Sequence, residues 1–201
     1  MAGFGRRPKR PAREAPEHDG PADPAADPES VARTICLNLL SVRARTRAEL
    51  AKELARRDVE DDVAATVLDR LVEVHLLDDA AFAEQWVDSR HRHRGLGRRA
   101  LSQELRTKGV ESEVASAALD ELGDDAERSK AAELVRKRLP SLDRVEPPVA
   151  ARRLVGMLAR KGYGAGLAYE VVKTEMAARG AELEDEVDGL EGDDEVAAGR
   201  R

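Results

Sequence analysis

The sequence predicts an all-α protein in which three tandem three-helix repeats form an elongated, slightly curved molecule with disordered tails. The composition favours helices throughout, because strong helix formers such as Ala, Leu, Arg and Glu dominate the 201 residues. Aromatic side chains make up only 2% of the chain, so we expect several small aliphatic cores rather than one deep core. An internal repeat supports the same architecture.

Residues 1–29 are expected to form a disordered N-terminal tail. Proline has a fixed φ angle and no backbone N–H, so a segment rich in it does not form regular structure. The prolines of this tail are at positions 8, 11, 16, 21, 24 and 28.

Two copies of a 22-residue segment lie 51 positions apart, at 50–71 and 101–122. A third, weaker copy begins at Leu154, another 53 residues on. Such a period is typical of proteins in which each unit packs on the next. Ten of the 22 positions are identical in the first two copies, and in the first copy these are Leu50, Glu53, Leu54, Val59, Glu60, Val63, Ala64, Leu68, Asp69 and Leu71.

Each copy has the apolar spacing of two helices, with apolar residues at i and i+4 on one face. Thr46 and Glu49 have the spacing of a capping box at a helix start. Asp58, Gly109 and Gly162 fall where one helix must end and the next begin. A further amphipathic helix precedes each pair, at about 30–43, 80–94 and 125–139.

The prolines help to place the repeat boundaries. Pro140 ends the last of these first helices, and Pro147 with Pro148 opens the helix that follows. The predicted repeats are 30–78, 79–123 and 124–178. Residues 179–201 follow as an acidic tail, in which any helix is expected to be short and poorly packed.

The net charge of −6 is unevenly distributed along the chain. Residues 30–180 carry 27 basic and 25 acidic groups, whereas residues 181–201 carry 2 basic and 9 acidic groups. The repeats are therefore slightly basic, and the acidity lies in the C-terminal tail. One hypothesis is that this tail weakens nonspecific DNA contact by competing for the same arginines.

Cys36 is the only cysteine, which excludes a disulfide framework and fits a reducing compartment. The sequence contains no apolar run as long as a membrane span or a signal-peptide core. We therefore expect a soluble, cytoplasmic monomer that does not contact membranes.

The densest chemical signal is a central basic patch between positions 90 and 108. Seven basic residues lie there against a single acid, Glu104. Charges of one sign create a local positive potential that suits phosphates or an acidic protein surface. The competing interpretation is a solvated charged face, but elsewhere in the chain acids are interleaved with the bases. The basic residues of the patch are Arg90, Arg92, Arg94, Arg98, Arg99, Arg106 and Lys108.

Other candidate chemistry is not supported. Gly95 and Gly97 do not make a phosphate loop, because no strand precedes them and no Gly-Lys-Ser/Thr follows. His91 and His93 are two apart, on nearly opposite sides of a helix, and do not suit a metal. We expect no catalytic residue, metal or cofactor. The aromatic residues Phe82, Trp86, Tyr163 and Tyr169 are expected to pack in the core.

Five motifs lie in the predicted repeats: 46–50 (TRAEL), 77–90 (LDDAAFAEQWVDSR), 95–98 (GLGR), 101–110 (LSQELRTKGV) and 160–163 (RKGY). Together they resemble the RecX family of regulatory proteins. The likeness covers about residues 30–178 and is most specific in the middle third. The third copy departs from the family pattern at Gly164 and Gly166, and the two tails lie outside it.

The resemblance implies a non-enzymatic partner of the RecA recombinase, acting in DNA repair, recombination and the SOS response. RecX proteins bind the RecA filament on single-stranded DNA and restrain ATP hydrolysis, strand exchange and co-protease activity by capping or disassembly. The basic patch, with Arg160 and Lys161, is then expected to contact the filament, with weak direct DNA contact as a further option.

Two other classes of function remain open. One is a direct DNA-binding regulator of helix-turn-helix type, although the paired helices lack a polar recognition face and aromatic stacking platforms are scarce. The other is a general helical-repeat scaffold, for which the basic patch would be incidental.

Overall fold

The computed structural model describes residues 27–191, with side chains through residue 180. This part of the chain is helical and contains no strand. None of its helices has the length and apolar character needed to cross a membrane. In order, the elements are α1 (Pro28–Val42), α2 (Arg47–Ala55), α3 (Asp61–Glu73), α4 (Asp79–Arg94), α5 (Arg98–Thr107), α6 (Ser112–Asp120), α7 (Asp124–Arg138), the 3-10 turn η1 (Leu139–Leu142), α8 (Pro147–Arg160) and α9 (Ala165–Glu191).

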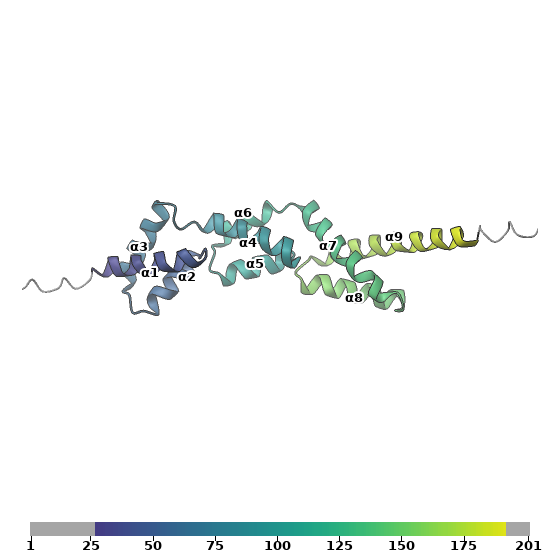
Figure 1. The fold of residues 1–201 in the computed structure, drawn as a ribbon, viewed down its shortest axis with the longest axis horizontal. Coiled ribbons are helices and arrows are strands. Elements are labelled where there is room, and N and C mark those ends of the chain that lie inside the picture. The colour runs from purple at the N-terminus through teal and green to yellow at the C-terminus, as the bar shows by residue number, and fades with distance from the viewer. Residues whose placement is uncertain (1–26, 192–201) are drawn as a thin grey trace, which may run out of the picture.

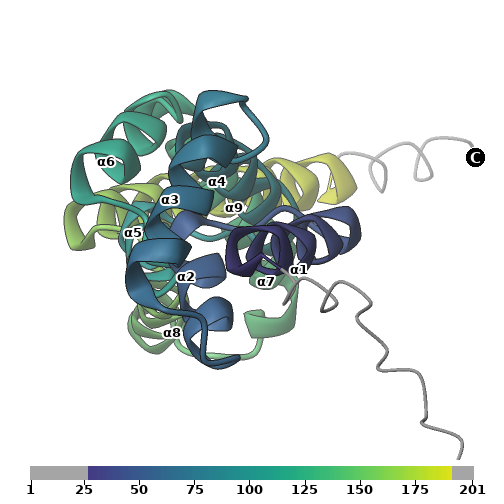
Figure 2. The same cartoon turned by 90° about the vertical axis from the view of Figure 1, so that its left-hand side faces the viewer.

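The helices form three units in a row, which confirms the predicted elongated repeat architecture (Figure 1). In each unit the third helix packs against both the first and the second, as α3 does against α1 and α2. The second helices, α2, α5 and α8, lie on the same side of the row (Figure 2). Equivalent side chains of the three units are therefore repeated along that side.

Each unit has its own aliphatic core, as the scarcity of aromatic residues predicted. The leucines of the second helices anchor these cores, because they are fully buried and two of them lie one turn apart in each unit. Truncating one such leucine to alanine typically costs about 2–5 kcal/mol. They are Leu50 and Leu54, Leu101 and Leu105, and Leu154 and Leu158.

The turns between second and third helices are as predicted. Asp58, Gly109 and Gly162 have φ angles of 57°, 76° and 87°. All three lie in the left-handed region that ends a helix and favours glycine. The third repeat keeps this turn although its sequence match is the weakest.

Two expectations about single residues need correction. The Thr46 hydroxyl accepts the Glu49 N–H, but the Glu49 carboxylate binds Arg43 and Lys108, so only half of the capping box forms. Tyr163 is buried, whereas Tyr169 is 64% exposed and is not a core residue.

The ends of the helical part also differ from the predicted repeat boundaries. α1 begins at Pro28, within the stretch assigned to the N-terminal tail. α9 continues past residue 178 into the stretch assigned to the acidic tail. The expectations for residues 1–26 and 192–201 lie outside the described residues.

Candidate interaction surface at the second inter-repeat joint

The first and second repeats meet at a joint made by the start of α2 and the turn after α5. The Thr46 hydroxyl donates to the carbonyl of Lys108 at 2.6 Å. The backbone N–H of Arg47 donates to the Asp79 carboxylate, at the start of α4, at 2.9 Å. The Lys108 ammonium donates to Glu49 at 2.7 Å. The helix start of one repeat is thus capped by the next repeat.

The second joint repeats this arrangement between the second and third repeats. Gly97, 51 residues after Thr46, donates its N–H to the carbonyl of Lys161 at 2.8 Å. The N–H of Arg98 donates to the Glu127 carboxylate at 2.8 Å, as Arg47 does to Asp79. The Lys161 ammonium reaches back to the carbonyl of Arg94 at 2.6 Å, so both lysines cross to the preceding repeat.

Glycine is required in the two turns whose carbonyls accept these hydrogen bonds, at Gly109 after α5 and at Gly162 after α8. We call these the receiving turns. A Cβ on Gly109 would overlap the Cβ of Ala48, and one on Gly162 would overlap Ala100. Both glycines also have positive φ angles, so a side chain there would be strained even without the collision. Close backbone approach therefore fixes each repeat on its neighbour.

Opposite charges reinforce the first joint. Burial alone would raise the pKa of Glu49, but hydrogen bonds and charges from Arg43 and Lys108 outweigh it and lower the pKa to about 2. Lys108 also lies over the Trp86 ring, 4.7 Å from its centroid. Lys108 is therefore held in place by contacts within the fold.

Several other residues of the central basic patch are also occupied within the chain. The Arg98 guanidinium lies 2.9 Å from Asp124, and its Nε is 3.2 Å from Glu127, which is only 6% exposed. Arg90 packs over the Trp86 ring at 4.1 Å and pairs with Glu104 at 3.3 Å. Arg98 thus joins the second repeat to the third, and Arg90 is held within the second repeat.

The other basic residues of the central patch lie at different places on the surface. Arg92 pairs with Asp88 at 2.6 Å, one turn earlier on α4. Arg106 is exposed at the far end of α5 and bonds to Gln103. The prediction of a single central patch over 90–108 therefore divides into paired, isolated and clustered residues.

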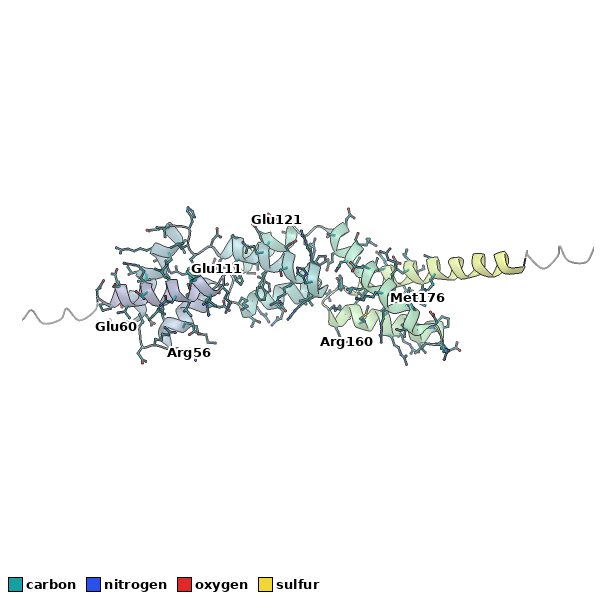
Figure 3. The ribbon with its side chains drawn as sticks, viewed as in Figure 1. Arg56, Glu60, Glu111, Glu121, Arg160 and Met176 are labelled. Atoms are coloured by element: carbon teal, nitrogen blue, oxygen red, sulfur yellow. The ribbon has the colours of Figure 1, made fainter. Side chains whose placement is uncertain are left out.

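Three arginines do gather at the second joint, and we call them the joint arginines: Arg94, Arg99 and Arg160. Arg94 ends α4 beside Lys161, and the N–H of Arg99 donates to Gly162 at 3.1 Å. Arg160 ends α8 on the side that faces the middle repeat (Figure 3). All three are exposed, and none has a carboxylate partner among the side chains of residues 27–180.

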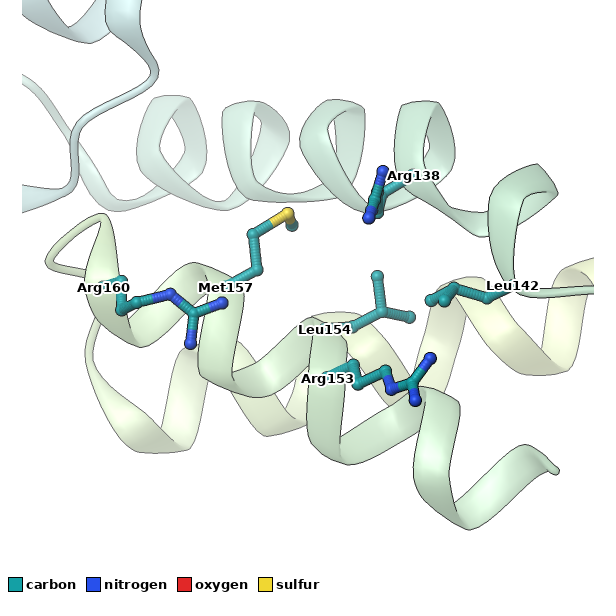
Figure 4. A pocket seen from close by; sticks show the side chains of 6 residues that line it. All are labelled: Arg138, Leu142, Arg153, Leu154, Met157 and Arg160. Carbon is teal, nitrogen blue, oxygen red and sulfur yellow. The ribbon is translucent and has the colours of Figure 1, made fainter. Parts of the chain in front are cut away.

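Sequence reasoning missed a second group of arginines next to this cluster. Arg153 on α8 and Arg138 at the end of α7 line a hollow of about 600 Å³ together with Arg160 (Figure 4). The seven-residue spacing of Arg153 and Arg160 places them on one helix face, and that signal was present in the sequence. Arg138 belongs to a different helix, α7, so its position beside these two arginines is apparent only in the folded chain.

The exposed arginines of this surface are suited to binding anionic groups. No cluster of His, Cys, Asp and Glu that could hold a metal ion is found in the part of the chain that the structure describes. Exposed guanidinium groups recognise carboxylates or phosphates through charged, often bidentate hydrogen bonds. The fold and surface define a rod-shaped helical-repeat protein with an uncompensated basic face at its second joint.

Comparisons with known proteins identify the family. Three family models match in order: "RecX, first three-helix domain" at residues 32–71, the second at 78–119 and the third at 125–172. Regulatory protein RecX of Thermobifida fusca (strain YX) is 50% identical over 177 residues, covering 87% of this chain and 96% of the relative. The chain belongs to the RecX family of regulatory proteins.

Further relatives agree with this assignment. Regulatory protein RecX of Mycolicibacterium smegmatis (strain ATCC 700084 / mc(2)155) is 53% identical over 168 residues, or 82% of this chain and 89% of the relative. The crystal structure of RecX from Lactobacillus salivarius superposes with a TM-score of 0.69 at 24% identity, over 76% of this chain and 97% of that one. The latter similarity supports the fold alone.

Proposed function

We propose that this chain binds the RecA recombinase and its filament on single-stranded DNA. In this proposal it restrains ATP hydrolysis, strand exchange and co-protease activity by capping filament growth or promoting disassembly. It acts in the cytoplasm, in DNA repair, recombination and the SOS response, and has no catalytic activity of its own. The membership of the RecX family supports this role.

The joint arginines are the observation that carries the proposal. Arg94, Arg99 and Arg160 come from two repeats and present positive charge that no described side chain neutralises. Uncompensated charge of one sign steers an oppositely charged partner and favours its association. An elongated molecule can place this cluster against a long, repetitive partner while other repeats make further contacts.

The test is the effect of the purified protein on DNA-stimulated RecA ATPase. The protein is added at concentrations too low to occupy the bare DNA, so that simple competition for DNA is excluded. The proposal expects ATP hydrolysis to fall at substoichiometric protein and no hydrolysis by the protein alone. Unchanged ATPase activity and strand exchange across a wide titration would refute it.

A direct DNA-binding regulator is the second candidate, because the joint arginines would suit phosphates as well as carboxylates. The salt dependence of binding separates the two. If three arginines contact single-stranded DNA, their loss should reduce the slope of log K against log salt by about 2, since each contact contributes about 0.7. If they contact RecA, affinity for bare DNA should hardly change.

A further inference from the structure

The hollow between α7 and α8 has features that the joint arginines alone do not explain. Its floor consists of three apolar side chains, and three guanidinium groups stand around it. Figure 4 shows Leu154 and Met157 projecting from α8 toward α7, with Arg138 opposite them and Arg153 and Arg160 near the two ends. Leu142 from η1 completes the floor.

The charges around this hollow are uncompensated although acids are available nearby. Arg136, two residues before Arg138, pairs with Glu175 at 3.4 Å. Arg179 pairs with Asp143, next to Leu142, at 3.1 Å. By contrast Arg138, Arg153 and Arg160 are exposed and have no carboxylate partner among the described side chains. Acids of the same repeat are therefore paired with Arg136 and Arg179, and the three arginines around the hollow are left without such a partner.

We propose that this hollow binds an acidic segment of the protein partner, anchored by one aliphatic or aromatic side chain. The anchor would lie on the half-buried Met157 and the edge of Leu142, above the buried Leu154, and carboxylates on either side of it would pair with the three arginines. This inference rests on the proposed function, because it names the kind of RecA surface that is recognised. A volume of about 600 Å³ accommodates one or two side chains.

The lining favours a peptide over nucleic acid. Bases bind single-strand sites mainly by stacking on aromatic rings, and none of the six lining residues is aromatic. Methionine instead adapts to differently shaped apolar groups, and arginine forms planar paired hydrogen bonds with carboxylates. An apolar floor inside an arginine rim is thus complementary to an apolar residue flanked by acids.

Site-specific photo-crosslinking tests the occupant. Cys36 is fully buried, so Met157→Cys places a single reactive thiol in the hollow for a short maleimide photo-crosslinker. Ser116→Cys, on the exposed side of α6, is the matched control. Labelled protein is irradiated with RecA assembled on single-stranded DNA, and the adducts are mapped by mass spectrometry.

The inference expects the Met157→Cys label to join a RecA segment that contains several carboxylates, and the Ser116→Cys label not to. Adducts mainly with DNA, or with this chain's own residues 181–201, would overturn it. So would the absence of any adduct while the labelled protein still inhibits RecA. If the parent protein leaves RecA ATPase unchanged, the proposed function fails as well, and that result is separate.

A pair of adjacent substitutions tests the same hollow without a label. Arg153→Glu reverses a charge on its rim, whereas Arg152→Glu makes the identical change at an exposed neighbour that does not line it. The inference expects Arg153→Glu to raise the half-inhibitory concentration against RecA about tenfold or more, and Arg152→Glu to change it less than about twofold. Equal effects of the two variants would contradict it.

Discussion

At the scale of single residues, the glycines in the receiving turns have the least freedom to change. Gly109→Ala combines a strained φ of 76° with a collision against Ala48. Gly123→Ala is a matched control, because its φ is 68° but a Cβ there meets nothing within 4 Å. We expect Gly123→Ala to lower the free energy of unfolding by about 1 kcal/mol and Gly109→Ala by about 2–4 kcal/mol, since the neighbouring backbone must also shift.

Urea denaturation of the two alanine variants measures this difference. Trp86, the only tryptophan of the chain, lies beside the first joint and reports on it by fluorescence. Equal destabilisation of the two variants would show that the close approach at Gly109 is not required.

Glu49 makes the first joint sensitive to acid. Its pKa is about 2 in the folded chain and 4.5 without partners, so its ionised form stabilises the fold above about pH 5. That contribution is lost as the pH falls from about 5 to 2. We expect a loss of about 1–2 kcal/mol, because water at this partly exposed site screens the ion pairs.

The measurement compares urea denaturation of the parent and Glu49→Gln at several pH values. The variant should be less stable at pH 7 and equally stable near pH 2. Burial raises the pKa of Asp79 in the same joint, which opposes the effect of Glu49, and the comparison removes this term because both proteins contain Asp79. A difference in stability that is independent of pH would contradict the account.

At the scale of helices, several features that depend on residues close together in the chain were predicted correctly from the sequence. The i, i+4 leucines, the prolines and the turn at Gly109 are set by neighbours along the chain, and each is found where it was predicted. The pairing of Arg98 was missed, because its partners Asp124 and Glu127 lie in the next repeat and face it only after folding.

The candidate site was predicted less well for the same reason. A run of basic residues in the sequence does not show which of them form ion pairs or where their side chains point. Arg90 and Lys108 were therefore grouped with Arg94 and Arg99. The Lys108–Gly109 and Lys161–Gly162 pairs of the resembling motifs prove to be joint residues. Lys-Gly motifs of this kind therefore indicate how the repeats pack on one another, and do not by themselves indicate a contact with a partner.

The two ends of the row of repeats lack the groups that form its joints. Two copies of the chain therefore cannot join end to end through the same contacts. The donors of the second joint are the N–H groups of Gly97, Arg98 and Arg99. The corresponding helix start in the third repeat is Pro147–Pro148, and proline has no N–H. At the other end Asp58, with a φ of 57°, occupies the place of the receiving glycine and carries the Cβ that Gly109 and Gly162 lack.

We therefore expect the protein to remain a monomer, because copies cannot join head to tail through the same contact. Size-exclusion chromatography with light scattering over a wide concentration range measures this. A mass of about 21.9 kDa at all concentrations is expected. A concentration-dependent dimer or longer series would show that another surface mediates self-association.

At the scale of the whole molecule, two groups of arginines can be distinguished: those paired with acids of this chain and those exposed without an acidic partner among the described side chains. Ion pairs such as Arg98 with Glu127 hold repeats together, and removing one partner would leave a buried charge uncompensated. The joint arginines and the arginines around the hollow form no ion pair with the described side chains and remain exposed. The central claim is that function depends on these free arginines and not on the total positive charge.

The most direct test compares two triple variants that lose the same charge. One is Arg94→Ala with Arg99→Ala and Arg160→Ala, and the other replaces exposed, paired arginines elsewhere, namely Arg56, Arg70 and Arg128. Inhibition of DNA-stimulated RecA ATPase is measured for both, with melting temperature as the check on folding. The account predicts a loss of about tenfold or more for the first variant and less than about twofold for the second, with both folded. Equal inhibition by the two variants, or full inhibition by the first, would contradict it.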